Sequence, residues 1–200
     1  MIQLSPFMNV EEFFEFVNRP ENDLRCFELV EGRVIEWEAS SRRHGFVCAK
    51  IGFTLCNYSR RAHKGNVALG GGGVILHRHP DTVRGPDVAY YDDALCLEDL
   101  PAIWGDLPPR LAVEVLMPGD RADYFLRKIA DYLEHGVEVV WVLDPDSKRV
   151  AIYSKNEGVK SLGDKETITG GEVLPGFRCK VADFFVLPGS AKKAKRKRSP

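Results

Sequence analysis

Two acidic residues lie in segments that otherwise have the apolar character of buried β-strands. Asp87 opens the run Asp-Val-Ala-Tyr-Tyr, and Glu114 is the charged residue within Leu-Ala-Val-Glu-Val-Leu at 111–116. A buried carboxylate costs free energy unless it is paired or bound to a cation. Carboxylates on two neighbouring strands therefore predict a site for a hard, oxygen-seeking divalent cation such as Mg²⁺.

A lysine follows Glu114 on a predicted helix at 121–134. At about 100° per residue, Lys128 lies at the margin of the apolar stripe and can carry its ammonium toward the adjacent strand. Two carboxylates and a lysine together suit phosphodiester hydrolysis. The carboxylates would hold a metal that activates water, and the lysine would orient that water or offset charge on the phosphate.

The same residues also allow a structural interpretation. Asp87 could cap a turn after Pro86, Glu114 could pair with a nearby arginine, and Lys128 could be a surface lysine. The pattern of residues leaves both interpretations open.

Hydrophobic periodicity and turn residues predict the elements that would position these groups. In order they are a helix at 9–18, a hairpin of strands 26–30 and 33–37, a helix at 43–62, a hairpin of strands 67–69 and 74–76, strands at 83–91 and 111–116, a helix at 121–134, a strand at 137–143 and two or three weaker strands at 149–177. Asn9 and Glu12 form a predicted capping box for the first helix. The strand–helix–strand unit at 111–143 favours a mixed sheet packed by helices.

The composition is that of a globular chain, with 200 residues of which 44% are hydrophobic and 28% charged. This excludes a collagen-like, wholly disordered or disulfide-scaffold protein. No apolar run approaches the roughly 18 residues needed to cross a bilayer, and no export signal is evident, so we expect no membrane partner. The five cysteines include no CxxC pair, which favours free thiols in a reducing cytoplasm.

Charge is distributed unevenly along the chain. Residues 191–200 carry six of the 28 Lys and Arg, which leaves 22 bases against 29 acids and a net charge of -7 for the rest. We expect one domain over 1–190 and a basic, disordered tail at 191–200. An acidic body implies that any contact with DNA is local.

Four short motifs together resemble the Uma-two family of restriction-endonuclease-like proteins, within the PD-(D/E)XK nuclease superfamily. They are Phe-Glu-Leu-Val-Glu-Gly at 27–32, Arg-Gly-Pro-Asp-Val-Ala at 84–89, Ala-Val-Glu-Val-Leu at 112–116, and Lys-Ile-Ala-Asp-Tyr at 128–132 leading into Val-Trp-Val-Leu-Asp-Pro at 140–145. The similarity covers roughly residues 8–155. It implies an α/β fold with a restriction-endonuclease-like core: a mixed central β-sheet flanked by helices, with an N-terminal helix and β-hairpin.

The resemblance also implies roles for individual residues. Asp87 and Glu114 would be catalytic metal ligands, and the backbone carbonyl of Val115 would complete the metal's shell. Leu116 stands where the superfamily's motif lysine is expected, so Lys128 would supply the catalytic lysine from the following helix.

Further positions that match the family carry less defined roles. Glu28 would be a third metal ligand or a water-positioning base, unless it is an outward-facing hairpin acid. Met117 stands where the family usually has a serine before Pro118. His44 also matches a family position, to which no role is assigned. Two more residues are candidates for nucleic-acid contacts: Arg121 beside the cleft, and Tyr132, which could instead hold Lys128 or pack in the core.

These observations predict an endonuclease that hydrolyses phosphodiester bonds in DNA with Mg²⁺ or Mn²⁺ and uses no organic cofactor. By analogy with the superfamily, we expect a homodimer. Leu116 and Met117 favour an alternative, a non-catalytic nucleic-acid-binding or regulatory module that retains the nuclease fold. A third hypothesis is a domain of unrelated function whose strand acids are structural.

Overall fold

The computed structural model of the chain describes residues 2–38 and 40–187, with side chains from residue 7 onward. Its helices are α1 (Val10–Val17), α2 (Arg42–Ala62) and α3 (Ala122–Glu134). Its strands are β1 (Ile2–Phe7), β2 (Cys26–Val30), β3 (Arg33–Trp37), β4 (Asn66–Leu69), β5 (Val74–His77), β6 (Thr82–Arg84), β7 (Val88–Tyr91), β8 (Leu111–Val115), β9 (Val139–Asp144), β10 (Arg149–Ser154), β11 (Gly158–Leu162), β12 (Thr167–Gly170) and β13 (Leu174–Lys180). The predicted basic tail lies outside the described residues.

The strands form two main sheets and a separate hairpin. One sheet has the order β1-β3-β2-β6-β5, the other has the order β11-β10-β9-β8-β7-β4, and β12 pairs with β13. In the six-stranded sheet β8 and β9 are parallel and the other neighbours antiparallel, and α3 connects β8 to β9. The expectation of an α/β fold with a mixed central sheet flanked by helices is therefore confirmed.

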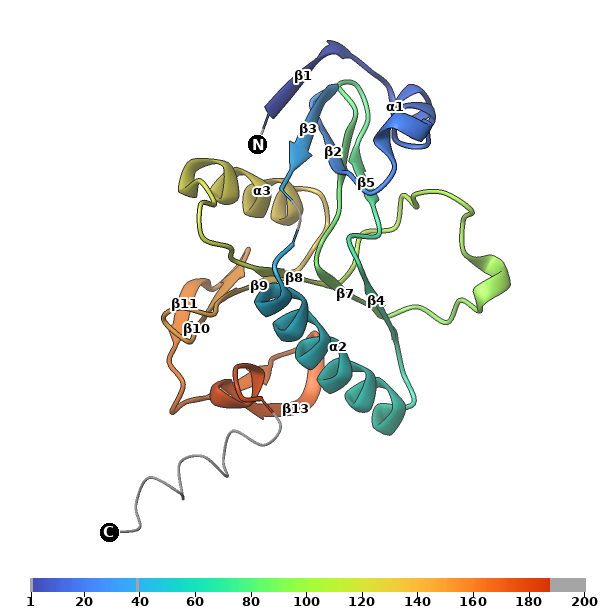
Figure 1. Ribbon diagram of the computed structural model, residues 1–200. Coiled ribbons are helices and arrows are strands. Elements are labelled where there is room, and N and C mark those ends of the chain that lie inside the picture. The colour runs from blue at the N-terminus through green and yellow to red at the C-terminus, as the bar shows by residue number, and fades with distance from the viewer. Residues whose placement is uncertain (1, 39, 188–200) are drawn as a thin grey trace.

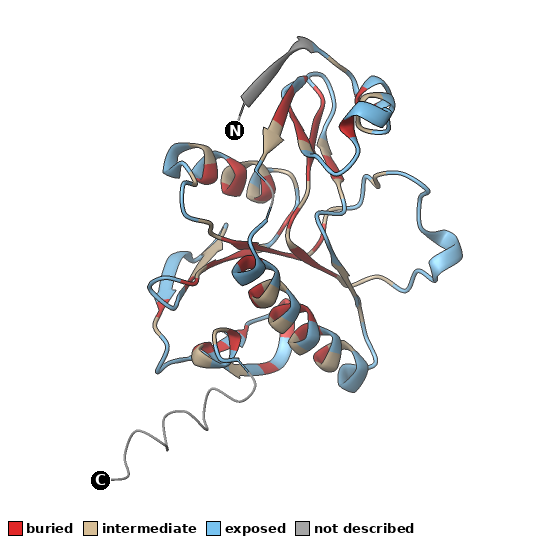
Figure 2. Ribbon diagram, in the orientation of Figure 1, coloured by how far each residue is buried: buried red, intermediate tan, exposed pale blue. Residues whose placement is uncertain are grey.

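The six-stranded sheet is covered on both faces. Figure 1 shows α3 on one side of β8 and β9 and α2 with the C-terminal hairpin on the other. Alternate residues of β8 enter the two layers, because Val113 packs in the core that contains α2 and Ala112 in the core that contains α3. Glu114 has the same strand parity as Ala112, so its carboxylate faces α3. In Figure 2 the buried residues lie along these strands and along the sides of α2 and α3 that face the sheet.

The predicted helices form close to the expected boundaries. The capping box of α1 is confirmed, with Asn9 accepting from the Glu12 amide at 2.8 Å and Glu12 accepting from the Asn9 amide at 3.0 Å. At the start of α2 the Ser41 hydroxyl accepts from the His44 amide at 3.2 Å. This cap fixes the first turn of α2, where His44 lies.

The predicted hairpin of strands 67–69 and 74–76 is wrong. β4 pairs with β7 in the six-stranded sheet, whereas β5 pairs with β6 in the five-stranded sheet. The predicted strand 83–91 is likewise divided into β6 and β7, which belong to different sheets. The sequence pattern missed both changes of sheet because each lasts only a few residues and the flanking strands remain apolar.

Two short connections between the sheets pack backbone against backbone. One is the glycine run 70–73 and the other is 85–87, and the Gly70 amide donates to the Asp87 carbonyl at 3.3 Å. A Cβ at Gly85 would lie 2.5 Å from the Gly71 carbonyl oxygen, so a side chain does not fit there. Glycine at this contact allows Asp87 to follow directly after the change of sheet.

The five-stranded sheet has its own apolar core under α1. Val10 and Phe13 pack with Leu29 of β2, and the Trp104 ring stacks on Phe13 at a centroid distance of 4.8 Å. This core fixes the strand that carries Glu28.

Among the described residues, no helix has both the length and the apolar character needed to cross a membrane.

Ile51 on α2 provides a test of the packing that holds this helix on the sheet. The side chain is fully buried, whereas Phe53 on the same helix is 67% exposed. We expect Ile51→Ala to lower the free energy of unfolding by about 2–5 kcal/mol and Phe53→Ala by less than about 0.5 kcal/mol, measured by urea denaturation. Equal losses in the two variants would contradict this assignment of the core.

Candidate active site

Lys128 lies at the centre of a buried group of charges. Its ammonium is 2.9 Å from Glu28 Oε1 and 2.9 Å from both oxygens of Glu114, and it also donates to the Gly85 carbonyl at 3.2 Å. The three charged side chains are only 4–6% exposed. The helix lysine and two of the predicted acids therefore come together from α3, β2 and β8. The exposed alternatives, a surface lysine and an outward-facing hairpin acid, are excluded by this burial.

Arg84 adds a second buried cation to the group. Its side chain is fully buried and donates to Glu28 Oε2 at 2.8 Å. On its other side it donates to Asp131 Oδ2 from Nε at 3.0 Å and from Nη2 at 2.5 Å, and it also contacts the Tyr124 hydroxyl. Arg84 thus ties β6 and β2 to α3, since Asp131 and Tyr124 both lie on that helix. Removing one member of such a buried pair typically costs about 3–5 kcal/mol, because the other charge is left unpaired.

The two buried glutamates differ in their preferred protonation. Burial raises the pKa of Glu28, but the charges of Lys128 and Arg84 and the Gly85 amide, which donates to it at 3.0 Å, lower the pKa overall to about 2. For Glu114, burial and the nearby Asp87 and Glu28 charges outweigh Lys128 and raise the pKa to about 8. Added positive charge beside Glu114 would therefore favour its ionised form.

Tyr132 holds the other side of Glu114. Its hydroxyl donates to Glu114 Oε1 at 2.7 Å and its side chain is fully buried. Burial is the main cause that raises the pKa of Tyr132, so the hydroxyl stays protonated and keeps donating. This burial leaves no surface of Tyr132 for a phosphate, and the hydroxyl orients the Glu114 carboxylate instead.

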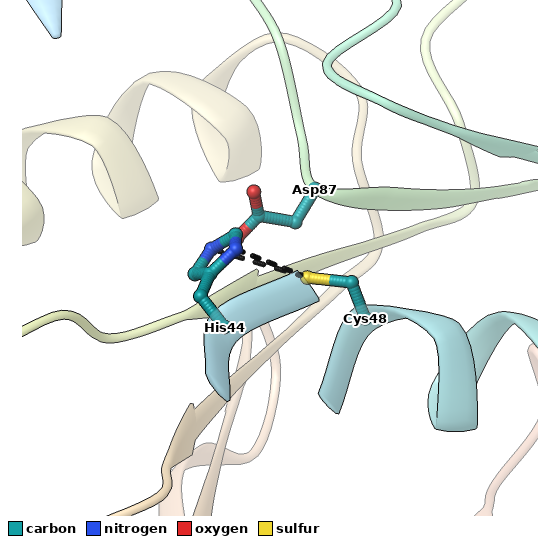
Figure 3. A group of neighbouring side chains, drawn as sticks. All are labelled: His44, Cys48 and Asp87. Carbon is teal, nitrogen blue, oxygen red and sulfur yellow. Dashed lines mark hydrogen bonds and ion pairs between the residues drawn. The ribbon is translucent and has the colours of Figure 1, made fainter. Parts of the chain in front are cut away.

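Asp87 lies beside this group with a different set of partners. Its Oδ2 accepts from the Val115 amide at 2.8 Å and makes a 3.0 Å hydrogen bond with Nε2 of His44. Figure 3 shows the His44 ring between Asp87 and Cys48, whose sulfur is 3.5 Å from Nδ1. The hydrogen bond to Asp87 raises the pKa of His44 despite its burial, and burial raises the pKa of the Cys48 thiol.

A cleft of about 500 Å³ opens between the two main sheets over these residues. It is lined by Glu28, His44, Asp87, Glu114 and Lys128, among others. Of Glu28, Asp87 and Glu114, Asp87 is the most accessible, with 23% of its side chain exposed. Its Oδ1 accepts no hydrogen bond from the described residues. The cleft therefore gives solvent and small ions access to one carboxylate oxygen.

The oxygen donors at this cleft fit a hard divalent cation. Asp87 offers a free oxygen, and Glu114 Oε2 accepts from Lys128 alone and so keeps one lone pair. Glu28 fits less well, because Lys128, Arg84 and the Gly85 amide occupy its oxygens. These contacts favour a role for Glu28 in holding Lys128 over a role as a third metal ligand. Val115 reaches Asp87 through its amide, and the role of its carbonyl stays a prediction.

Arg121 is not brought into the buried group. It is 70% exposed and pairs with Asp123 across 2.8 Å at the start of α3. Arg121 is therefore on the surface whereas Lys128 is in the interior, and a contact of Arg121 with nucleic acid stays a prediction. At Met117, the amide donates to Asp120 Oδ2 at 2.7 Å, so an aspartate caps the turn in which the family usually has a serine.

Sequence reasoning did not select Arg84, Asp131, Tyr124 or Cys48 as site residues. Arg84 offered a usable signal, because an arginine within an otherwise apolar strand needs a buried acid as partner. The other three are on helical faces that resemble ordinary surface or boundary positions.

Comparisons with known proteins agree with this geometry. The sequence matches the Uma2 family, described as "Putative restriction endonuclease", over residues 10–182. Among solved structures, the fold is similar to that of a protein described as "a putative nuclease belonging to DUF820" from Anabaena variabilis ATCC 29413. The TM-score is 0.75 at 16% sequence identity, over 89% of this chain and 97% of that chain. A comparison with curated proteins found no match.

The mixed sheet and its flanking helices define a restriction-endonuclease-like α/β protein. The chain belongs to the Uma2 family, and this membership supports a nuclease function.

The low pKa of Glu28 generates a test of the buried ion pairs. Because the folded value of about 2 lies below the usual 4.5, the ionised carboxylate stabilises the fold above about pH 4.5, and this stability is lost as the pH falls toward 2. The loss amounts to as much as about 3 kcal/mol over that window. We expect urea denaturation between pH 5 and pH 3 to give a shallower pH dependence for Glu28→Gln than for the wild type.

The exposed Glu157 provides the control for losing one surface carboxylate. Glu157→Gln should keep the wild-type dependence on pH. A wild-type slope in Glu28→Gln would mean that this carboxylate is not held ionised by Lys128 and Arg84.

Proposed function

We propose that the protein is a metal-dependent endonuclease that hydrolyses phosphodiester bonds in DNA. The observation that carries this proposal is the placement of Lys128 on Glu114, in a cleft that also contains Asp87. The helix lysine thereby supplies an ammonium beside the motif acid although Leu116 occupies the usual lysine position. Family membership supports the nuclease part of the proposal, and the oxygen donors support Mg²⁺ or Mn²⁺.

In this proposal, Asp87 and Glu114 would hold the cation through Oδ1 and Oε2. When bound, the cation would lower the pKa of a water molecule and neutralise charge on the phosphate. Tyr132 and Lys128 keep the Glu114 carboxylate oriented, and the His44 and Val115 hydrogen bonds do the same for Asp87. The chain thus fixes both proposed ligands before substrate arrives.

Lys128 would contribute directly to the reaction. Its donors are directed at Glu28, Glu114 and the Gly85 carbonyl, of which the Gly85 contact is the longest at 3.2 Å. Exchanging that donation for one to a phosphate oxygen or the attacking water would stabilise the charge that develops during hydrolysis. Burial lowers the pKa of Lys128, but the charge of Glu28 and that of Glu114 in its ionised form raise it overall, so the ammonium stays protonated.

One observation favours the second candidate, a non-catalytic module. Both oxygens of Glu114 accept hydrogen bonds inside the protein and the side chain is 4% exposed. Lys128 and Tyr132 could therefore complete a purely structural ion pair. The two candidates differ in turnover, which a cleavage assay measures directly.

Three further parts of the proposal rest on analogy or composition. DNA as substrate and a homodimeric state follow from the superfamily chemistry, and the cytoplasm is the proposed compartment because the cysteines in the described residues are free. Light scattering of the purified protein, and digestion of DNA beside RNA, would test the first two.

The central prediction concerns cleavage of supercoiled plasmid in Mg²⁺ or Mn²⁺. We expect metal-dependent nicking that EDTA abolishes and that falls by about 100-fold or more in Asp87→Asn, Glu114→Gln and Lys128→Met, since each change removes a charge at the reacting centre. Lys155→Met, at an exposed turn, is the matched control and should retain wild-type activity.

Folding of each variant is checked by its thermal melting curve, because removing a buried charge also affects stability. A folded wild type that nicks no DNA, or nicking that survives in folded Glu114→Gln and Lys128→Met, would favour the non-catalytic module.

A further inference from the structure

His44, Cys48 and Asp87 form a second group of potential metal ligands. His44 and Cys48 are one helical turn apart on α2 and therefore project from the same face. Asp87 approaches them from the connection between β6 and β7, as Figure 3 shows. The ligand atoms of the three side chains all lie within 4.8 Å of one another.

The spacing of these atoms is close to that of a tetrahedral metal centre. Zinc bonds of about 2.0–2.1 Å to nitrogen or oxygen and about 2.3 Å to sulfur place neighbouring ligands roughly 3.3–3.6 Å apart. Here His44 Nε2 is 3.0 Å from Asp87 Oδ2 and 3.9 Å from Cys48 Sγ. These two separations differ from the tetrahedral values by a few tenths of an ångström. The third, between Asp87 and Cys48, is at most 4.8 Å and would have to shorten toward about 3.6 Å through side-chain rotation.

The backbone around the group is already fixed. The Ser41 cap holds the first turn of α2, and the Val115 amide holds Asp87 in place. The His44 side chain is 8% exposed and that of Asp87 is 23% exposed, so the group lies at the wall of the cleft with one open side. A cation bound there would have three protein ligands and one position left for water.

The donor set differs in kind from that of the proposed magnesium site. Mg²⁺ takes oxygen ligands, whereas a thiolate with an imidazole suits Zn²⁺ and similar softer cations. Among the described residues, no other group of three His, Cys, Asp or Glu side chains brings its ligand atoms within 4.8 Å of one another. The sulfur of Cys48 is therefore the feature that selects the class of metal.

We propose that His44, Cys48 and Asp87 form a binding site for Zn²⁺ or a cation of similar softness, which shares Asp87 with the proposed magnesium site. Binding of the softer cation draws Asp87 toward α2 and adds positive charge next to the position that Mg²⁺ would take. It follows, where the proposed nuclease function holds, that low concentrations of Zn²⁺ inhibit cleavage at a fixed concentration of Mg²⁺.

The test uses Co²⁺ as a spectroscopic substitute for Zn²⁺ on the full chain without nucleic acid. Coordination of Co²⁺ by a thiolate gives an intense charge-transfer absorption in the near ultraviolet, so it reports directly on Cys48. We expect this absorption in the wild type and its loss in Cys48→Ser, with Co²⁺ affinity reduced by more than about 100-fold, since loss of supporting contacts alone costs about 10–100-fold. Added Zn²⁺ should displace the bound Co²⁺, whereas Mg²⁺ in large excess should not.

Cys56→Ser is the matched control, because Cys56 lies on the same helix and is exposed. It should retain the wild-type absorption and affinity. The proposal is overturned if the wild type gives no thiolate absorption with Co²⁺, or if Cys48→Ser retains it. Loss of the absorption in Cys56→Ser alone would also overturn it.

This readout separates the metal site from the proposed nuclease function. A protein that binds Co²⁺ through Cys48 but cleaves no DNA would retain this site and refute the nuclease proposal. A protein that cleaves DNA with Mg²⁺ but shows no Cys48-dependent absorption would do the reverse. If both hold, Zn²⁺ inhibition of the wild type should weaken in Cys48→Ser, measured relative to the Mg²⁺-dependent activity of each protein.

Discussion

The arrangement of the two sheets and α3 depends on the contacts of Lys128 and Arg84 with their carboxylate partners. Two cations and the acids Glu28 and Glu114 are almost wholly removed from water, and Asp131 is held at their margin. Such burial is tolerated only when every charge is paired and hydrogen-bonded, so β2, β6, β8 and α3 must all meet at one place. The five-stranded sheet and the six-stranded sheet are thereby joined through ions as well as through apolar packing. The same requirement makes the interior polar where catalysis is proposed.

The two short connections between the sheets determine how Asp87 reaches that place. The chain leaves β6 and enters β7 within three residues, and the glycine run after β4 packs directly against this turn. Close backbone contact keeps the turn short, because no side chain separates Gly85 from the Gly71 carbonyl. Asp87 consequently lies between α2 and the end of β8, where it accepts from both His44 and Val115.

Asp87 thus stands between two chemically different sets of donors. On one side are the oxygens of Glu114, which suit a hard cation, and on the other are an imidazole and a thiol, which suit a softer one. A single carboxylate that serves both sets would make the occupancy of each depend on the other. The position of α2, set by its apolar contacts with the sheet and by the Ser41 cap, would then influence which cation is bound.

Strand alternation and helical periodicity are local properties that can be read from the sequence, and they predicted α1 to α3, the hairpin of β2 and β3, and the buried strand that carries Glu114. The same patterns, with the family resemblance, also singled out Asp87, Glu114, Lys128 and Glu28. The partners of these elements and residues depend on the tertiary structure. In it β4 and β5 belong to different sheets, Arg84 and Tyr132 donate to the buried acids, Arg121 is on the surface, and His44 and Cys48 meet Asp87. The reason is physical, since these contacts join residues distant in sequence, and burial gives each charge a partner that its neighbours in sequence do not specify.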